Sequence, residues 1–164
     1  MPVQASDNVQ RIRISHVIPC ILEGIVRPDA SSIQEFFQLL HREAFGGVSS
    51  ITVYNTYLTI GAIADAYVTE VYTSDRVKEL MGEQTAMIQA VIEMLSKCKT
   101  PKNDGLNADD VLYIKELISC LESLKGEAQG LSDYVGGSTD AQARYNTYRD
   151  KAWDQIKMLL GLEE

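Results

Sequence analysis

Histidine is scarce in this chain of 164 residues, which contains only His16 and His41. A carboxylate-bridged di-iron bundle needs paired Glu-x-x-His motifs on facing helices, and the sequence has none. It also lacks the His-Glu-x-x-His zinc motif, the glycine-rich phosphate loops of nucleotide-binding proteins and the Gly-x-Ser-x-Gly motif of serine hydrolases. These absences argue against the familiar enzyme classes, so we expect no cofactor and no catalytic residues.

Basic charge is also in short supply. The chain has 15 Lys and Arg against 23 Asp and Glu, a net charge of −8. Residues 1–47 hold four basic and five acidic groups, so residues 48–164 carry 11 basic and 18 acidic groups, a balance of −7. Nucleic-acid binders usually present a basic stripe, and anionic membrane surfaces attract basic segments. We therefore expect neither partner; the acidic residues form a solvated surface or, alternatively, a face for a basic protein.

Cysteines and long apolar runs are few. The three cysteines, Cys20, Cys98 and Cys120, are odd in number and lie in apolar helical contexts, which is typical of thiols packed in a core in a reducing compartment. The apolar run at 17–26 is interrupted by Pro19 and Glu23, is too short to span a bilayer, and does not resemble a signal peptide. We expect a cytoplasmic protein, although delivery by a specialised secretion system would suit the same sequence.

What the sequence does contain is a series of amphipathic segments with apolar residues at i, i+3 and i+4. This spacing predicts an all-α fold, an antiparallel bundle of four main helices at about 50–73, 75–99, 108–129 and 139–160, forming one domain over 1–164. An N-terminal helical pair precedes them. Its first helix covers about 19–26, and its second starts near Ser32 and stops at Gly46 and Gly47.

The helix at 50–73 has a second, weakly polar face with almost no charge. That face contains Thr, Asn and Ala residues, with Asn55 and Ala62 among them. A helix without a charged face is typical of the interior of a bundle. The pattern therefore predicts a central helix that is covered on two sides.

Asp65 falls within the apolar arc of the same helix, between Tyr54 and Tyr72 on one side and Leu58 on the other. A buried carboxylate must be hydrogen-bonded, ion-paired or raised in pKa. The favoured interpretation is a structural hydrogen bond to a tyrosine or a basic residue. The functional alternative is a pocket carboxylate that binds a small ligand between helices.

Aromatic residues gather on the last helix, where Tyr145, Tyr148 and Trp153 lie near Arg144 and Arg149. Aromatics with Arg are typical of binding hot spots, so these three are candidate partner-binding residues. The simpler interpretation places both tyrosines in the core and Trp153 at the edge of the stripe.

His16 and Cys20 are four residues apart and would share a helix face, as half of a zinc site does. Pro19 lies between them and interrupts such a helix, so we expect no bound metal.

These observations favour a non-enzymatic helical bundle that acts through protein–protein interaction, as an adaptor, a neutralising partner, a secretion-linked factor or an assembly subunit, or that self-associates. The alternative is a bundle that binds or senses a small molecule near Asp65.

Overall fold

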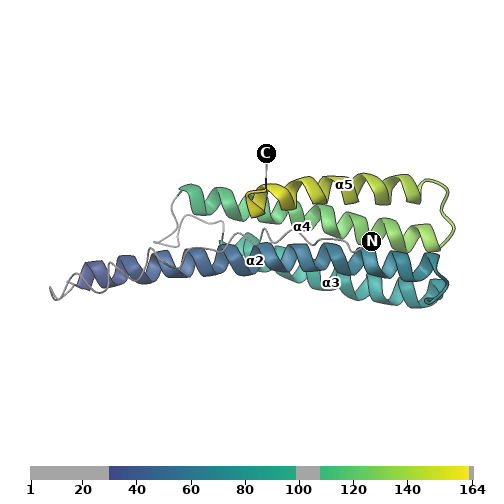
Figure 1. The fold of residues 1–164 in the computed structure, drawn as a ribbon, viewed down its shortest axis with the longest axis horizontal. Helices are drawn as coiled ribbons and strands as arrows, with labels where there is room; N and C mark the ends of the chain where they lie inside the picture. Colours follow the sequence, from purple (N-terminus) through teal and green to yellow (C-terminus); the bar gives the residue numbers. More distant parts are fainter. Residues whose placement is uncertain (1–29, 99–107, 163–164) are drawn as a thin grey trace, which may run out of the picture. The chain divides into compact units, whose positions relative to one another are not determined.

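The computed structural model describes residues 30–98 and 108–162, with side chains at 40, 43–97 and 108–162. The described residues form four helices and no strand: α2 (Ala30–Val68), α3 (Ser74–Cys98), α4 (Ala108–Val135) and α5 (Ala141–Leu160). Figure 1 shows these helices, which confirm the all-α fold class. The chain divides into two compact units, Met1–His41 and Arg42–Glu164, and the packing described below lies in the second.

The helix α2 continues where the sequence predicted a break. Gly46 and Gly47 lie inside α2, so the expected second N-terminal helix and the first main helix are one element. A glycine inside a helix costs only about 1 kcal/mol relative to alanine, and contacts can offset that cost. One such contact is the Tyr113 hydroxyl of α4, which donates to the carbonyl oxygen of Gly46 at 3.0 Å. The other predicted member of the pair, at 19–26, lies outside the described residues.

The connection between α2 and α3 starts earlier than expected, because α2 ends at Val68 rather than near 73. Glu70 adopts a left-handed backbone conformation with φ 60°, and the Val71 amide donates back to the carbonyl oxygen of Ala66 at 2.8 Å. Thr73 then precedes α3, and its hydroxyl accepts from the Arg76 amide at 3.3 Å. The bounds predicted for α3 and α5 agree with the structure to within two residues.

The helix α4 runs six residues beyond its predicted end at 129, because Gly130 is a packing residue and not a turn. A Cβ atom at Gly130 would lie 2.9 Å from the backbone of Tyr145 on α5. Gly126, one helical turn earlier, lies under the ring of Tyr148, which a Cβ would meet at 2.6 Å. The two glycines therefore allow α5 to approach α4 closely. Gly161 ends α5 in a left-handed conformation, which agrees with the predicted end of this helix at 160.

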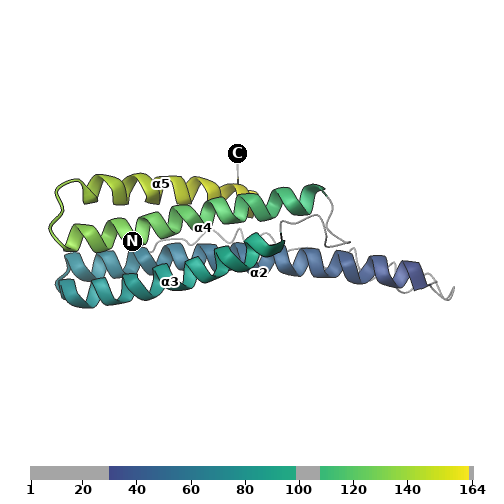
Figure 2. The ribbon, with the colours of Figure 1, turned by 180° about the vertical axis from the view of Figure 1, so that it is seen from behind.

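The four helices bury one shared core, and the two opposite views of the ribbon show them lying alongside one another (Figures 1 and 2). Polar contacts link the same helices: Lys125 donates to the Gln89 side-chain oxygen at 2.7 Å, and Gln155 donates to the Ser119 hydroxyl at 2.7 Å. The packing is that of a helical bundle. Its fully buried side chains include Val53, Ile60, Val77, Met81, Cys120, Leu124, Leu131 and Ile156.

Candidate functional sites

The most unusual residue of the core is a carboxylate. Glu127 on α4 is 0% exposed, and neither of its carboxylate oxygens has a hydrogen-bond partner among the described residues. Burial raises its pKa from 4.5 to about 8, and the positive charge of Arg149 opposes that rise only in part. A buried carboxyl with no partner is favoured in its neutral form, so Glu127 is protonated at neutral pH.

Arg149 of α5 lies between two tyrosines beside this carboxyl. Its guanidinium donates to the Tyr145 hydroxyl at 3.0 Å and to the Tyr57 hydroxyl at 3.4 Å. The guanidinium carbon also lies 5.8 Å from the centre of each tyrosine ring, within the range of cation–π attraction. The hydrogen bond to Tyr57 is the main cause that raises the pKa of Arg149 above its usual value. Arg149 therefore stays charged and joins α2 to α5.

The neighbouring thiol has no nucleophilic character. Cys120 is fully buried and free, and burial, with a smaller effect from Glu127, raises its pKa to about 12. Since the thiolate is the reactive form, Cys120 is a packing residue, as its apolar context predicted. A protonated acid and a protonated thiol without access to solvent offer no general base and no nucleophile at neutral pH.

Sequence reasoning missed Glu127 because it placed a helix end at 129. With α4 continuing through Gly130, Glu127 lies three residues after Leu124 and four before Leu131, both of which are buried. The 3.6-residue period therefore placed Glu127 on the apolar side of the helix, but the predicted end at 129 put it in the last turn, where a carboxylate is ordinarily exposed.

Asp65 is not the buried carboxylate that the helical wheel predicted, because its side chain is exposed. The prediction placed Leu58 and Tyr72 beside Asp65 in the apolar arc, whereas these side chains are 46% and 36% exposed. The buried side of α2 is narrower and contains Val53, Ile60 and the residues that share their face. The condition that made Asp65 a candidate, its burial, is therefore absent.

The three aromatic candidates of α5 do not form one exposed patch. Tyr145 is 8% exposed and belongs to the core, as its place in the apolar stripe predicted. Trp153 is half-buried, and its ring stacks on that of Tyr57 with centres 5.6 Å apart. Tyr148 is 38% exposed and, contrary to the core prediction, covers Gly126 from the surface. Their assignment to partner binding stays a prediction.

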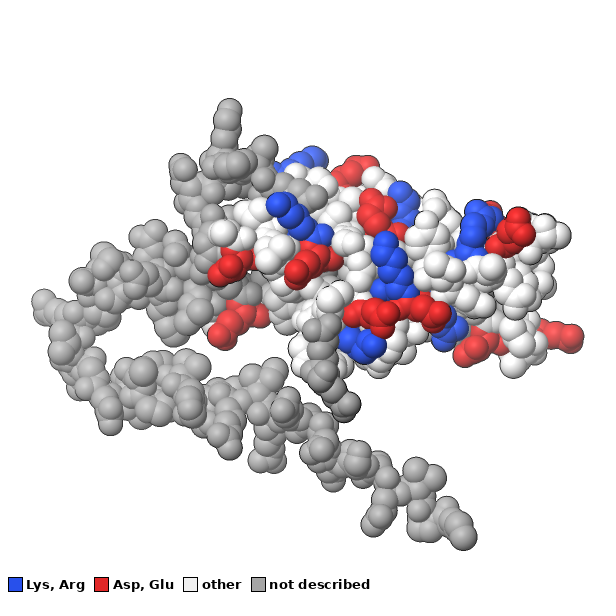
Figure 3. All heavy atoms as spheres, turned by 90° about the horizontal axis from the view of Figure 1, so that it is seen from above, with Lys and Arg blue, Asp and Glu red and all other residues white. Residues whose placement is uncertain are grey.

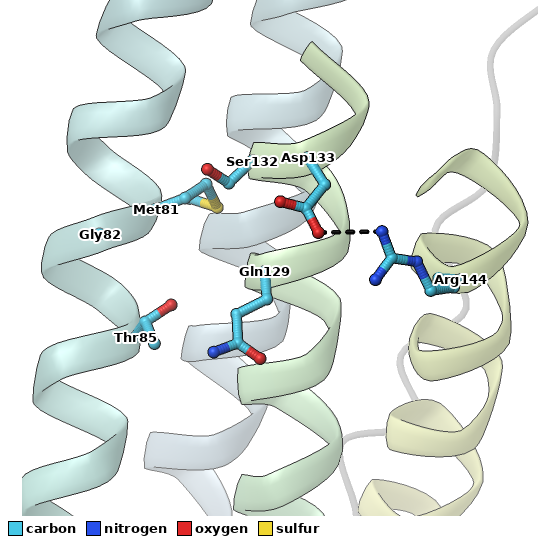
Figure 4. Close-up of a pocket in the computed structure, with 7 residues that line it drawn as sticks. All are labelled: Met81, Gly82, Thr85, Gln129, Ser132, Asp133 and Arg144. Carbon is cyan, nitrogen blue, oxygen red and sulfur yellow. Dashed lines mark hydrogen bonds and ion pairs between the residues drawn. The ribbon is translucent and has the colours of Figure 1, made fainter. Parts of the chain in front are cut away.

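A cavity of about 400 Å³ opens between α3, α4 and α5. Figure 4 shows Thr85 from α3 opposite Gln129 and Ser132 from α4, with Arg144 of α5 paired to Asp133 at 2.9 Å. Both members of that ion pair are about half-exposed. Ligand pockets are lined mostly by apolar side chains with a few buried polar groups, whereas half of this cavity's lining is polar and its charged pair is half-exposed. Asp65 does not line it.

The face of α2 that points away from the core differs most from the prediction, which had placed it in the interior of the bundle. The exposed fractions of Val48, Ile51 and Leu58 are 66%, 58% and 46%, so this face is not covered on the side away from the core. The predicted central position of the helix, covered on two sides, is therefore wrong. We call this surface the α2 face; its exposed residues are Ala44, Phe45, Gly47, Val48, Ile51, Thr52, Asn55, Leu58, Thr59 and Ala62.

The α2 face is also less polar than its composition indicates. The hydroxyl of Thr52 donates to the carbonyl oxygen of Val48 at 2.7 Å, and that of Thr59 donates to the carbonyl oxygen of Asn55 at 2.8 Å. These bonds satisfy the hydroxyl donors within the helix. The α2 face thus combines exposed apolar side chains with threonines whose donors need no other partner.

Charge lies elsewhere on the molecule. Residues 44–64 contain no Asp, Glu, Lys or Arg. By contrast, the view from above in Figure 3 shows acidic and basic side chains interspersed over the described surface. An uncharged strip over five helical turns is therefore a local property of α2.

Neither a metal centre nor a membrane span is found in the described parts of the chain. No three His, Cys, Asp or Glu side chains there lie close enough to hold a metal ion. Nor does any helix there have both the length and the hydropathy needed to cross a membrane. His16 and Cys20, the half-site considered from the sequence, lie outside the described residues.

No protein-family model, curated protein or solved structure matches this chain.

Proposed function

We propose that this protein is a non-enzymatic helical bundle that acts through protein–protein interaction, and that the α2 face is the surface it uses. The observation that carries the proposal is the exposure of Val48, Ile51 and Leu58 on one uncharged helix face. Single exposed apolar residues are ordinary, but a contiguous apolar strip is typical of an interaction site.

The absence of charge on this face narrows the type of partner. Interface centres are depleted of charged residues and usually carry a polar rim. Nucleic acid would need cations on the α2 face, and residues 44–64 provide none. A second helix or an apolar groove on another protein fits the strip, because an amphipathic helix docks through residues at i, i+3, i+4 and i+7.

The proposal includes the antiparallel arrangement of consecutive helices. Tyr113 near the start of α4 contacts Ser49 of α2, while Tyr134 near its end contacts Tyr67, which supports a parallel course for α2 and α4. The contacts of α4 with α5 run in the opposite order, since Ser119 meets Gln155 and Gly130 meets Tyr145.

Site-specific photo-crosslinking in the source cell tests the proposal. A photoreactive amino acid replaces Leu58 on the α2 face or, as the matched control, Leu112 on α4, which is 55% exposed. We expect a protein adduct of defined mass from position 58 and none from position 112. Adducts at both positions, lipid adducts only, or no adduct at position 58 would contradict the proposal.

A further inference from the structure

The exposed residues of α2 follow the spacing of a coiled coil. Counting along the helix, the intervals between the central residues of the α2 face are four, three, four, three and four. This alternation averages 3.5 residues and keeps one narrow strip aligned with a partner helix. In heptad terms Val48, Asn55 and Ala62 occupy a positions, and Ala44, Ile51 and Leu58 occupy d positions. We call these six residues the α2 seam: Ala44, Val48, Ile51, Asn55, Leu58 and Ala62.

Asn55 lies near the middle of the seam, between Ile51 and Leu58. A single asparagine at an a position costs stability when it is buried against an apolar surface. In a parallel pair of identical helices that cost is reduced, because the two amides face each other and each can donate to the other. The asparagine then fixes the register and limits the assembly to two helices. An apolar groove on an unrelated protein gives Asn55 no such partner.

The rows that flank the seam favour a second copy as well. The e positions are Phe45, Thr52 and Thr59, and the g positions are Gly47, Tyr54 and Gly61, none of them charged. Two chains of net charge −8 repel each other over most of their surfaces. None of the α2 side chains in the seam and its flanks carries a charge, so two copies approach there without like charges from α2 meeting. A cation from another helix lies beside them: the Arg149 guanidinium of α5 would be 3.6 Å from a Cβ at Gly61. A different protein is usually selected by complementary charge, and α2 itself offers none in this region.

We propose that two copies of this chain associate through α2, as a parallel helix pair in register at Asn55. The inference rests on the proposed function and names its partner. The pair ends after Ala62, because the next d position is Asp65 and two of these carboxylates would face each other. Each α2 thereby gains a cover on the face that its own bundle leaves exposed.

The size of the seam sets the strength of the dimer. Eighteen intervals from Ala44 to Ala62, at a rise of ~1.5 Å each, give a length of ~27 Å. With a helix width of ~10 Å the strip has a footprint of roughly 300 Å². That is below the roughly 600 Å² per partner which marks the upper limit of weak interfaces. We therefore expect a weak, reversible dimer that forms only at high protein concentration.

Sedimentation equilibrium of the full chain, from about 5 to 500 μM, measures this association. Leu58→Lys places an unpaired charge in the seam and is expected to raise the dissociation constant at least about tenfold. The matched control Leu112→Lys makes the same change at an exposed leucine of α4 and is expected to leave the constant unchanged. Circular dichroism checks that both variants stay folded, which we expect because both side chains are exposed.

Two further variants test the register. Asn55→Val removes the amide that limits the assembly, so we expect tighter association and species larger than a dimer. Asp65→Asn removes the facing carboxylates and is expected to tighten the dimer about two- to fivefold. If the dissociation constant of Asp65→Asn equals that of the wild type, the parallel arrangement is wrong. If Asn55→Val forms a dimer no tighter than that of the wild type, the proposed role of Asn55 is wrong.

The outcome also separates this inference from the proposed function. A wild-type chain that is monomeric at 500 μM, or a dimer that Leu58→Lys does not weaken, overturns self-association through α2. The photo-crosslink at position 58 is a separate measurement that tests the proposed function. An adduct with a different protein keeps the proposed function and rejects the second copy, whereas an adduct of twice the mass of the chain supports both.

Discussion

Replacement of the buried carboxyl by its neutral isostere, Glu127→Gln, should change how stability depends on pH. The pKa of Glu127 is 4.5 in an unfolded chain and about 8 in the fold. Below pH 4.5 both states hold the proton and the group has no effect. Between pH 4.5 and 8 the folded state holds a proton that the unfolded state has lost, so stability falls as the pH rises.

The size of the effect follows from this interval. Each pH unit between the two pKa values costs about 1.4 kcal/mol, so the loss reaches at most about 5 kcal/mol above pH 8. Gln is neutral at every pH and has nearly the same shape. The free energy of unfolding of Glu127→Gln should therefore exceed that of the wild type by less than about 1 kcal/mol near pH 5 and by a few kcal/mol more at pH 9.

Urea denaturation followed by circular dichroism, at pH 5 to 9 and a few micromolar protein, measures the difference between the two chains. The control is Glu122→Gln, on the same helix, because the Glu122 side chain is exposed. Its difference from the wild type should stay constant and small over the whole range. A constant difference for Glu127→Gln too, without growth between pH 5 and 8, would refute a raised pKa and with it the neutral buried acid.

Four other substitutions test the packing and the exposed position of Asp65. Gly130→Ala should lower the free energy of unfolding by about 2 kcal/mol, since its Cβ would lie 2.9 Å from the Tyr145 backbone. Gly82→Ala, in open space on α3, is the control and should raise the free energy of unfolding by up to about 1 kcal/mol. Equal effects of the two substitutions in thermal melts would contradict the close approach of α4 and α5. Trp153→Ala should cost about 2–3 kcal/mol of folding because its ring stacks on Tyr57, and an unchanged urea midpoint would argue against that stacking. Asp65→Asn should alter the unfolding free energy at low concentration by less than about 0.5 kcal/mol, and a larger loss would restore Asp65 as a structural acid.

The presence of helices could be predicted from the sequence, because apolar residues recur at the 3.6-residue period of a helix over long segments. The bounds of α3 and α5 followed from that period and from turn residues such as Gly161. The helix ends predicted at Gly46 and just before Gly130 were wrong, because both glycines lie inside helices. A glycine that ends a helix and one that allows a neighbouring helix to approach look identical in a single sequence, and only the position of the second helix distinguishes them.

The candidate site could be predicted less well, because burial depends on which faces the neighbouring helices cover. A helical wheel shows that Ile51 and Leu58 lie on one side of α2, but it does not show whether another helix packs there. Asp65 was therefore assigned to the interior and the α2 face to a covered position, and both are exposed. Glu127 was missed for the reverse reason, since an end at 129 placed it in the last turn of its helix, where a carboxylate is ordinarily exposed.

The buried Glu127 and the exposed α2 face were both missed from the sequence, and neither contributes to the stability of the isolated bundle. A neutralised carboxyl without a hydrogen-bond partner destabilises the core, and a strip with Ile51 and Leu58 exposed gains nothing from burial in the isolated bundle. A core optimised for stability alone would place an apolar side chain at Glu127, and a surface optimised for it would place polar side chains on α2. Burial of the strip against another helix would offset this cost, and the proposed dimer would provide that helix. Glu127 gains nothing from such an association, because it lies inside the bundle and not on the α2 face.

The two costs are therefore independent, and this has a measurable consequence. Glu127→Gln should stabilise the fold at pH 9 without changing the dissociation constant of the dimer. Leu58→Lys should weaken the dimer without changing how the free energy of unfolding depends on pH.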